Sequence, residues 1–181
     1  MDGYACLNWY FEESVKLNNT IAMIYLGRLY QKGLNTKQDY GKTYEYYKSA
    51  ADNNDSDGLY YLGNLYLKGL GVEKNPREAI KLFEKASKKN NPKAFIKLGI
   101  FYSRGIIVPR DYLLAKQYFE LASLQNNPSS FFYLGDLLSN GEYFDVDLPK
   151  AIDNFQKCSE IENEVKIAYE AKDDFFLPEY R

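Results

Sequence analysis

The apolar and polar positions of this chain recur every 36 residues, as the spacing of Gly27 and Gly63 shows. Over residues 58–87 the apolar positions fall at helical spacing on both sides of a glycine-rich turn, which predicts two amphipathic helices. A Leu-Gly pair marks the first helix of each unit, and another glycine follows six residues later. The pairs are Leu26-Gly27, Leu62-Gly63, Leu98-Gly99 and Leu134-Gly135, and the later glycines are Gly33, Gly69, Gly105 and Gly141. Repetition with a period of roughly 20–50 residues is typical of stacked helical repeats.

The second helix of each unit carries a small residue near its end and an aromatic residue three positions earlier. The small residues are Ser14, Ala50, Ala86, Ala122 and Cys158, and the aromatic residues are Phe11, Tyr47, Phe83, Phe119 and Phe155. A glycine in one helix and a small residue in the other allow a close approach, which offsets a cost of about 1 kcal/mol for glycine inside a helix. We expect each aromatic ring to fill the gap between units.

Polar residues and glycines mark where these helices start and end. Asp39, Asn75, Asp111 and Asp147 precede the second helices, where a side-chain oxygen can accept a hydrogen bond from the first helical turn. Gly33 follows a first helix at a position that favours positive φ. The pattern therefore predicts an all-α solenoid of stacked helix-turn-helix units.

The pattern extends over one domain, residues 1–181. We expect a lone second helix at 4–18, which is either a cap or part of a longer array. The predicted repeats are 19–54, 55–90, 91–126 and 127–162, and a C-terminal cap and tail follow at 163–181. Within that last part, 162–171 is expected to form a degraded first helix. The apolar tail at 173–181 is expected to fold back on the last repeat or, alternatively, to dock on a partner or a neighbouring copy.

The composition excludes several classes of function. A net charge of −2 provides no field that would gather nucleic acid or an anionic membrane. The chain has no histidine, the usual general base and zinc ligand, so we expect no enzymatic activity, no cofactor and no metal. Cys158 takes the place of a small core residue, which favours a packed thiol over a reactive one. The N-terminus lacks a signal-peptide pattern and no apolar run approaches about 20 residues, so we expect a cytoplasmic protein.

The cleanest unit resembles the Sel-one-like repeat (SLR) family, a branch of the tetratricopeptide-like helical repeats. The matching residues are Leu62-Gly63 with Tyr66, Gly69 with Gly71-Val72, and Asn75, Ala79, Phe83 and Ala86. The turns of the first and fourth units depart from this pattern. The resemblance implies a right-handed α-α superhelix of antiparallel helix pairs that serves as a scaffold or adaptor for other proteins.

In a stack of this kind the first helices line the concave face, and three positions per unit are expected to look inward. They form a tyrosine row and a cation row that becomes neutral or acidic in the fourth unit, where Asn140 follows Arg104. The candidate binding residues are Tyr25, Arg28, Lys32, Tyr61, Asn64, Lys68, Lys97, Arg104, Tyr133 and Asp136. They could hold a carboxylate or an acidic peptide. Alternatively, Lys32, Lys68 and Arg104 only complement the helix dipole in the last helical turn.

The sequence therefore predicts a protein-protein interaction scaffold that binds a protein or peptide partner, acidic or through its C-terminus. We expect neither nucleic acid nor membrane as a partner. The alternative is a structural segment of a longer repeat array, or a homo-oligomerisation module that acts through the C-terminal tail.

Overall fold

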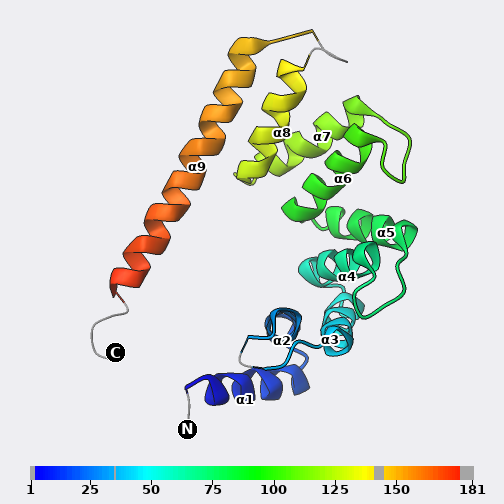
Figure 1. Ribbon diagram of the computed structural model, residues 1–181, viewed down its shortest axis with the longest axis vertical. Coiled ribbons are helices and arrows are strands. Elements are labelled where there is room, and N and C mark those ends of the chain that lie inside the picture. The colour runs from blue at the N-terminus through cyan, green and yellow to red at the C-terminus, as the bar shows by residue number, and fades with distance from the viewer. Residues whose placement is uncertain (1–2, 35, 141–144, 176–181) are drawn as a thin grey trace. The chain divides into compact units, whose positions relative to one another are not determined.

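The computed structural model describes residues 3–34, 36–140 and 145–175, and these residues form nine helices and no strand (Figure 1). The helices are α1 (Gly3–Lys16), α2 (Thr20–Lys32), α3 (Tyr40–Asp52), α4 (Ser56–Lys68), α5 (Pro76–Ser87), α6 (Pro92–Arg104), α7 (Tyr112–Ser123), α8 (Pro128–Ser139) and α9 (Leu148–Phe175). From α4 onward each helix starts 36 residues after the helix two places before it in the chain. This spacing confirms the predicted all-α repeat. The chain forms two compact units, Met1–Leu98 and Gly99–Arg181, which are described separately below.

Side-chain caps fix where the helices begin. The Oδ1 atoms of Asp39, Asn75, Asp111 and Asp147 accept hydrogen bonds from backbone N–H groups three residues later, at 2.9–3.1 Å. All four predicted caps are thus confirmed. Asn19, Asp55 and Asn91 cap the first helices of their repeats in the same way, each toward the N–H three residues on.

Left-handed backbone at the helix ends lets the chain reverse. Gly33, Gly69 and Gly105 follow the first helices with φ between 65° and 71°, which confirms the role predicted for Gly33. Asn18, Asn54, Asn90 and Asn126 follow the second helices with φ between 51° and 64°, at the same 36-residue spacing. Asparagine tolerates this conformation better than most side chains do.

Ile107 breaks this rule. It takes the place that Gly71 has one repeat earlier, with φ of 72° against 68° for the glycine. A β-branched side chain is strained in this region because its Cβ crowds the following carbonyl oxygen.

The two helices of each repeat meet where an aromatic ring lies on a glycine. In the first unit a Cβ added to Gly63 would lie 2.8 Å from Cε1 of Phe83, and Tyr47 covers Gly27 still more closely. In the second unit Phe119 covers Gly99, and a Cβ on Gly135 would lie 2.8 Å from Cε1 of Phe155. A side chain in place of any of these glycines would push the two helices apart.

The rings of the second helices also stack on the tyrosine of the following first helix. Within the first unit the ring centroids of Phe11 and Tyr25 are 3.9 Å apart, and those of Tyr47 and Tyr61 are 5.0 Å apart. In the second unit Phe119 and Tyr133 are 4.9 Å apart. The ring therefore joins helices within a repeat and between repeats, as the sequence predicted.

The last ring of the series shows what the stacking contributes. Tyr47 and Phe83 are fully buried and Phe119 is 1% exposed, whereas Phe155 keeps 38% of its surface exposed. Phe155 still covers its glycine, and its ring meets that of Phe132 edge to face at 5.8 Å. Much of the burial of each ring therefore comes from the repeat that follows it.

The C-terminal part differs from the sequence prediction. The expected separate helix at 162–171 is absent, because α9 continues without a break from Leu148 to Phe175. The stretch 158–171 holds no glycine or proline and contains four glutamates and two alanines, which favour a helix, so nothing in it stops one. The predicted tail at 173–181 lies outside the described residues from 176 onward.

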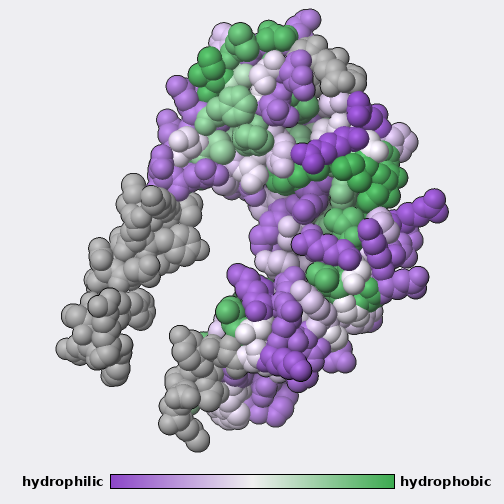
Figure 2. Space-filling model, viewed as in Figure 1, coloured by the Kyte–Doolittle hydropathy of each residue, from purple (hydrophilic) through white to green (hydrophobic). Residues whose placement is uncertain are grey.

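Apolar side chains are exposed over α8 and the first half of α9, where Figure 2 shows hydrophobic residues gathered on one surface. The residues are Phe132, Leu148, Ile152 and Phe155. Surfaces of this kind commonly contact another chain or element. The patch fits the alternative role as part of an array or an oligomer, which stays a prediction.

Replacement of Gly63 by alanine is expected to destabilise the fold, because the new Cβ overlaps the Phe83 ring. Overpacking of this kind costs roughly 1–3 kcal/mol. Gly41→Ala is the matched control, since this helical glycine is exposed and a new Cβ meets only the Asp39 carboxylate, at 3.2 Å. Urea unfolding should show a lower free energy of unfolding for Gly63→Ala and an unchanged one for Gly41→Ala. Equal effects of both changes would contradict the ring-on-glycine account.

Strain at Ile107 is tested by comparing Ile107→Gly with Ile107→Ala. Both variants lose the same apolar contacts, but only glycine adopts the positive φ without strain. We expect the glycine variant to be more stable to urea than the alanine variant by about 1 kcal/mol. An alanine variant as stable as the glycine variant would show that the backbone there is unstrained.

Candidate functional site

The first helices of the N-terminal unit present the predicted residues on one stripe each. Positions three and seven residues apart lie on the same helix face, so Tyr25, Arg28 and Lys32 share a face of α2. Tyr61, Asn64 and Lys68 repeat this arrangement on α4. The tyrosines and Asn64 are half-buried and the three cations are exposed. The Asn64 amide donates to the Tyr60 carbonyl oxygen at 2.9 Å.

Lys97 on α6 occupies the position that tyrosine has in the other repeats. Its side chain is half-buried, and this burial lowers the pKa of its ammonium group; the nearby charge of Lys68 lowers it further. Within the described part of the chain, neither Lys97 nor Lys68 forms a hydrogen bond or an ion pair through its ammonium group. Two cations therefore lie close together without a compensating carboxylate.

Lys93, one turn earlier on α6, has the opposite environment. Its Nζ lies 3.1 Å from Oδ1 of Asp57 and donates to the hydroxyl of Tyr61 at 3.3 Å. Burial opposes its charge, but the hydrogen bonds to Tyr61 and Asp57 outweigh that effect and raise its pKa. The structure thus neutralises one lysine of α6 and leaves Lys97 uncompensated. The sequence analysis missed Lys93, although it lies one turn before Lys97 on the same helix.

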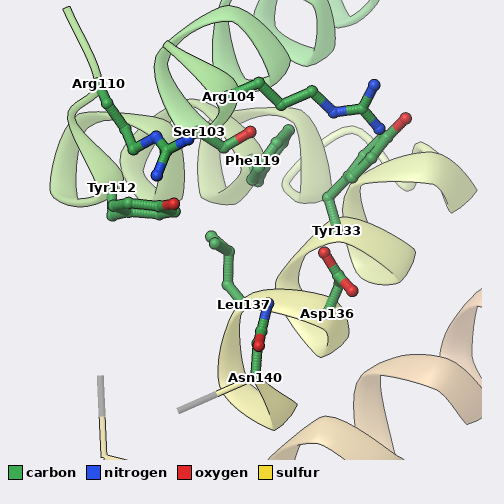
Figure 3. A pocket seen from close by; sticks show the side chains of 9 residues that line it. All are labelled: Ser103, Arg104, Arg110, Tyr112, Phe119, Tyr133, Asp136, Leu137 and Asn140. Atoms are coloured by element: carbon green, nitrogen blue, oxygen red, sulfur yellow. The ribbon is translucent and has the colours of Figure 1, made fainter. Parts of the chain in front are cut away.

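In the C-terminal unit a pocket of about 280 Å³ lies between the end of α6, the following connection, α7 and α8 (Figure 3). It contains three predicted residues, Arg104, Tyr133 and Asp136, together with Asn140 from the same row. Five further lining residues were missed by the sequence analysis: Ser103, Arg110, Tyr112, Phe119 and Leu137.

The connection 105–111 brings Arg110 to this pocket. Gly105 reverses the chain with φ of 65°, and the N–H of Asp111 donates to the Tyr102 carbonyl oxygen at 2.9 Å. The fold-back places the Arg110 guanidinium 5.7 Å from the centre of the Tyr112 ring. The available sequence signal was a basic residue just before the cap of the second helix, which the preceding repeat also has as Lys74.

Two of the charged side chains that line the pocket, Arg104 and Asp136, are not paired with each other. Arg104 and Asp136 are both exposed, and in the described structure neither side chain forms a hydrogen bond or an ion pair. The Phe119 ring is 1% exposed and stacks on the Tyr133 ring with 12° between their planes. The described lining residues can bind a polar group.

The remaining candidate features are metal ligands, the Cys158 thiol and membrane-spanning helices. Among the described residues no cluster of three or more His, Cys, Asp or Glu side chains could hold a metal ion. Burial, followed by the Glu162 carboxylate, raises the pKa of the Cys158 thiol, which disfavours the reactive thiolate. The searched helices include none with the length and apolar character needed to cross a bilayer, judged over the described residues.

The chain matches known proteins throughout its repeated part. The Sel1 repeat family model matches residues 20–55, 56–91, 92–127 and 130–160. A Sel1 repeat protein from Oxalobacter formigenes is 30% identical with a TM-score of 0.77, over 80% of this chain and 59% of that chain. An immunity protein from Pseudomonas aeruginosa is 26% identical with a TM-score of 0.62, over 83% of this chain and 56% of that chain.

A protective antigen of uropathogenic Escherichia coli strains, which displays an SLR fold, is 23% identical with a TM-score of 0.75. The match covers 84% of this chain and 33% of that antigen. The chain thus spans a third to three fifths of the length of these solved relatives. No curated protein sequence matches it. The repeat matches extend over most of the chain and agree with the 36-residue helix spacing, so the chain belongs to the Sel1 repeat family.

Proposed function

We propose that this protein is an interaction scaffold whose N-terminal unit binds an acidic segment of a partner protein. Proteins built from Sel1 repeats generally mediate protein–protein interactions and are generally not enzymes. The binding surface is formed by the inward positions of α2 and α4 and by Lys97 of α6. We call it the cationic face; it consists of Tyr25, Arg28, Lys32, Tyr61, Asn64, Lys68 and Lys97.

The observation that carries this proposal is the environment of Lys97. An uncompensated ammonium group costs free energy when it is half-buried, and a second cation nearby adds to that cost. A carboxylate bound between Lys97 and Lys68 removes both costs at once and forms charge-assisted hydrogen bonds. The cationic face is therefore better satisfied with an anionic partner than without one.

The dipole explanation accounts for part of the cation row only. Lys32 and Lys68 lie in the last turn of α2 and α4, where a positive charge is favourable in any case. Lys97 lies in the middle of α6, which extends from Pro92 to Arg104, so the helix end does not stabilise its charge. Complementation of helix ends thus leaves the least favourable cation unexplained.

The tyrosines supply contact area beside the charges. Tyr25 and Tyr61 are half-buried, and each is fixed by stacking on the ring of the preceding second helix. Rings held in this way lose little conformational freedom when a peptide packs on them. Orientation would come from the cations and Asn64, and contact area from the rings.

The test uses Lys97→Tyr combined with Lys68→Gln. Tyrosine is the residue that other repeats carry at position 97, where it stacks on the preceding ring, so the fold should keep its thermal stability. The probe is a set of fluorescein-labelled dodecapeptides rich in Glu and Asp, with amidated C-termini. Loss of two charge-assisted contacts should weaken binding about tenfold or more in fluorescence anisotropy.

Lys85→Gln is the matched control, because this exposed lysine lies on α5 outside the cationic face. It should bind the acidic peptides as tightly as the unaltered protein does. A set of Lys-rich peptides should bind neither the unaltered protein nor Lys85→Gln. If no acidic peptide binds, or if the double variant binds as well as the control, the proposal fails.

A further inference from the structure

We infer that the apolar surface at the end of the last repeat binds the same surface of a second copy of this chain, in a two-fold contact centred on α9. We call this surface the end patch; it consists of Phe132, Leu148, Ile152 and Phe155. It shares no residue with the cationic face, so the inference does not depend on the proposed function and adds a second interaction surface.

The positions of the end patch are buried elsewhere in the chain. Phe119 is 1% exposed because Tyr133 of the next first helix stacks on its outer face. Phe155, 36 residues later, covers its glycine in the same way but is 38% exposed. Ile152 is 56% exposed, whereas Ile80, two repeats earlier, is 7% exposed. A face that is closed inside the stack is therefore open at its end.

The segment that follows in the chain is unsuited to cover this face. By the 36-residue spacing, Lys166 takes the position of Ser130, which is fully buried. Glu170 takes the position of Leu134, which is 7% exposed. The earlier repeats all have small or apolar residues at these two positions, because burial of an unpaired charge is costly. Two charges at buried positions are a physical reason why α9 does not turn back over Phe155.

The residues beyond α9 are too few to return to the end patch. α9 ends at Phe175, 20 residues after Phe155, and is drawn as one unbroken helix in Figure 1. A helix of this length extends about 30 Å from Phe155, at 1.5 Å per residue. Residues 176–181 span at most about 20 Å even when fully extended. Neither segment covers the patch, so its partner is a second molecule.

The charges beside the end patch favour an apolar partner over a charged one. The Nζ atom of Lys150 lies 2.8 Å from Oδ2 of Asp147. The Nζ atom of Lys157 lies 2.7 Å from Oδ2 of Asp153. These groups are paired within one copy and leave little charge to attract an acidic or a basic partner. A second copy brings an apolar patch flanked by the same internal pairs, so these groups do not repel one another across the contact.

The arrangement of the end patch fits contact between two α9 helices. Leu148, Ile152 and Phe155 are four and three residues apart and form one stripe, with the spacing at which paired helices interlock. The Phe132 ring extends the stripe onto α8 and meets Phe155 edge to face at 5.8 Å. Ile152 is the middle residue, so in an antiparallel contact it lies nearest the two-fold axis. Phe155 of each copy then packs beside the Leu148 side chain of the other.

The area of the end patch matches the apolar part of a dimer interface. Its side chains are 38–56% exposed. At about 200 Å² for a fully exposed side chain of this size, they offer about 400 Å² per copy. A standard interface buries about 800 Å² per partner, somewhat more than half of it apolar. A two-fold contact also closes on itself, so neither copy is left with an exposed patch.

The experiment measures the mass of the full chain by analytical ultracentrifugation over a range of protein concentrations. We expect the unaltered protein to approach twice the monomer mass as the concentration rises from micromolar to millimolar. Ile152→Glu places two carboxylates side by side at the two-fold axis and should raise the dissociation constant of the dimer about tenfold or more. Because Ile152 is 56% exposed, this variant should keep its helical circular dichroism and its thermal stability.

Leu113→Glu is the matched control, because it makes the same kind of change at a leucine of α7 that is 61% exposed and lies outside the end patch. It should form the dimer as readily as the unaltered protein does. Ile152→Lys should be monomeric alone, like Ile152→Glu. An equal mixture of these two variants should form a mixed dimer, because opposite charges then meet at the axis.

A protein that stays monomeric at every concentration would overturn the inference and would leave the end patch to a different partner. Loss of the dimer in Leu113→Glu but not in Ile152→Glu would place the contact on α7 and would also overturn it. A mixture of the Glu and Lys variants that stays monomeric would show that residue 152 does not face its own copy, which rules out the two-fold contact.

Discussion

The contact between an aromatic ring and a helical glycine is the constraint on which this fold depends. Phe83 on Gly63 and Phe119 on Gly99 bring the two helices of a repeat so close that no side chain fits between them. The outer face of the same ring then receives the next repeat, so one residue fixes two interfaces. Because stability in such arrays is close to a sum of neighbour terms, the contact has to recur in every repeat. Because the contact recurs every 36 residues, the repeat could be predicted from the sequence.

Most of the helix boundaries could be predicted from the sequence, because they depend on neighbouring residues. The caps at Asp39 and Asp111 and the left-handed turn at Gly33 need only neighbouring residues, and the structure has them as predicted. The C-terminal helix was predicted incorrectly because repeat spacing suggested a separate helix at 162–171, whereas no residue in the stretch before or within it ends α9. Periodicity indicates where an element belongs, but the breaking residues decide whether it ends.

The candidate site was predictable only in part, for a physical reason. Helical spacing put Arg28 on the same face of α2 as Tyr25, and Lys68 on the same face of α4 as Tyr61, since that depends on position alone. That these faces bind a partner stays a prediction. The burial of Lys97 and the pairing of Lys93 with Asp57 depend on neighbouring repeats, so spacing could not distinguish the two lysines. Arg110 reaches the pocket through the backbone path of a turn in which Ile107 takes the place of Gly71. Polar contacts made across repeats, and the paths of irregular turns, are the part that the sequence pattern does not encode.

A direct test of the account is to map an acidic, amidated peptide onto the protein by methyl and amide chemical shifts. The account predicts that the largest changes fall on α2, α4 and α6, at Asn64, Lys68 and Lys97. Raising the salt concentration should reduce them, since charge attraction supplies much of the binding. Changes centred on the exposed apolar residues of α8 and α9, and insensitive to salt, would contradict the account. That outcome would assign partner binding to the apolar surface of the last repeat.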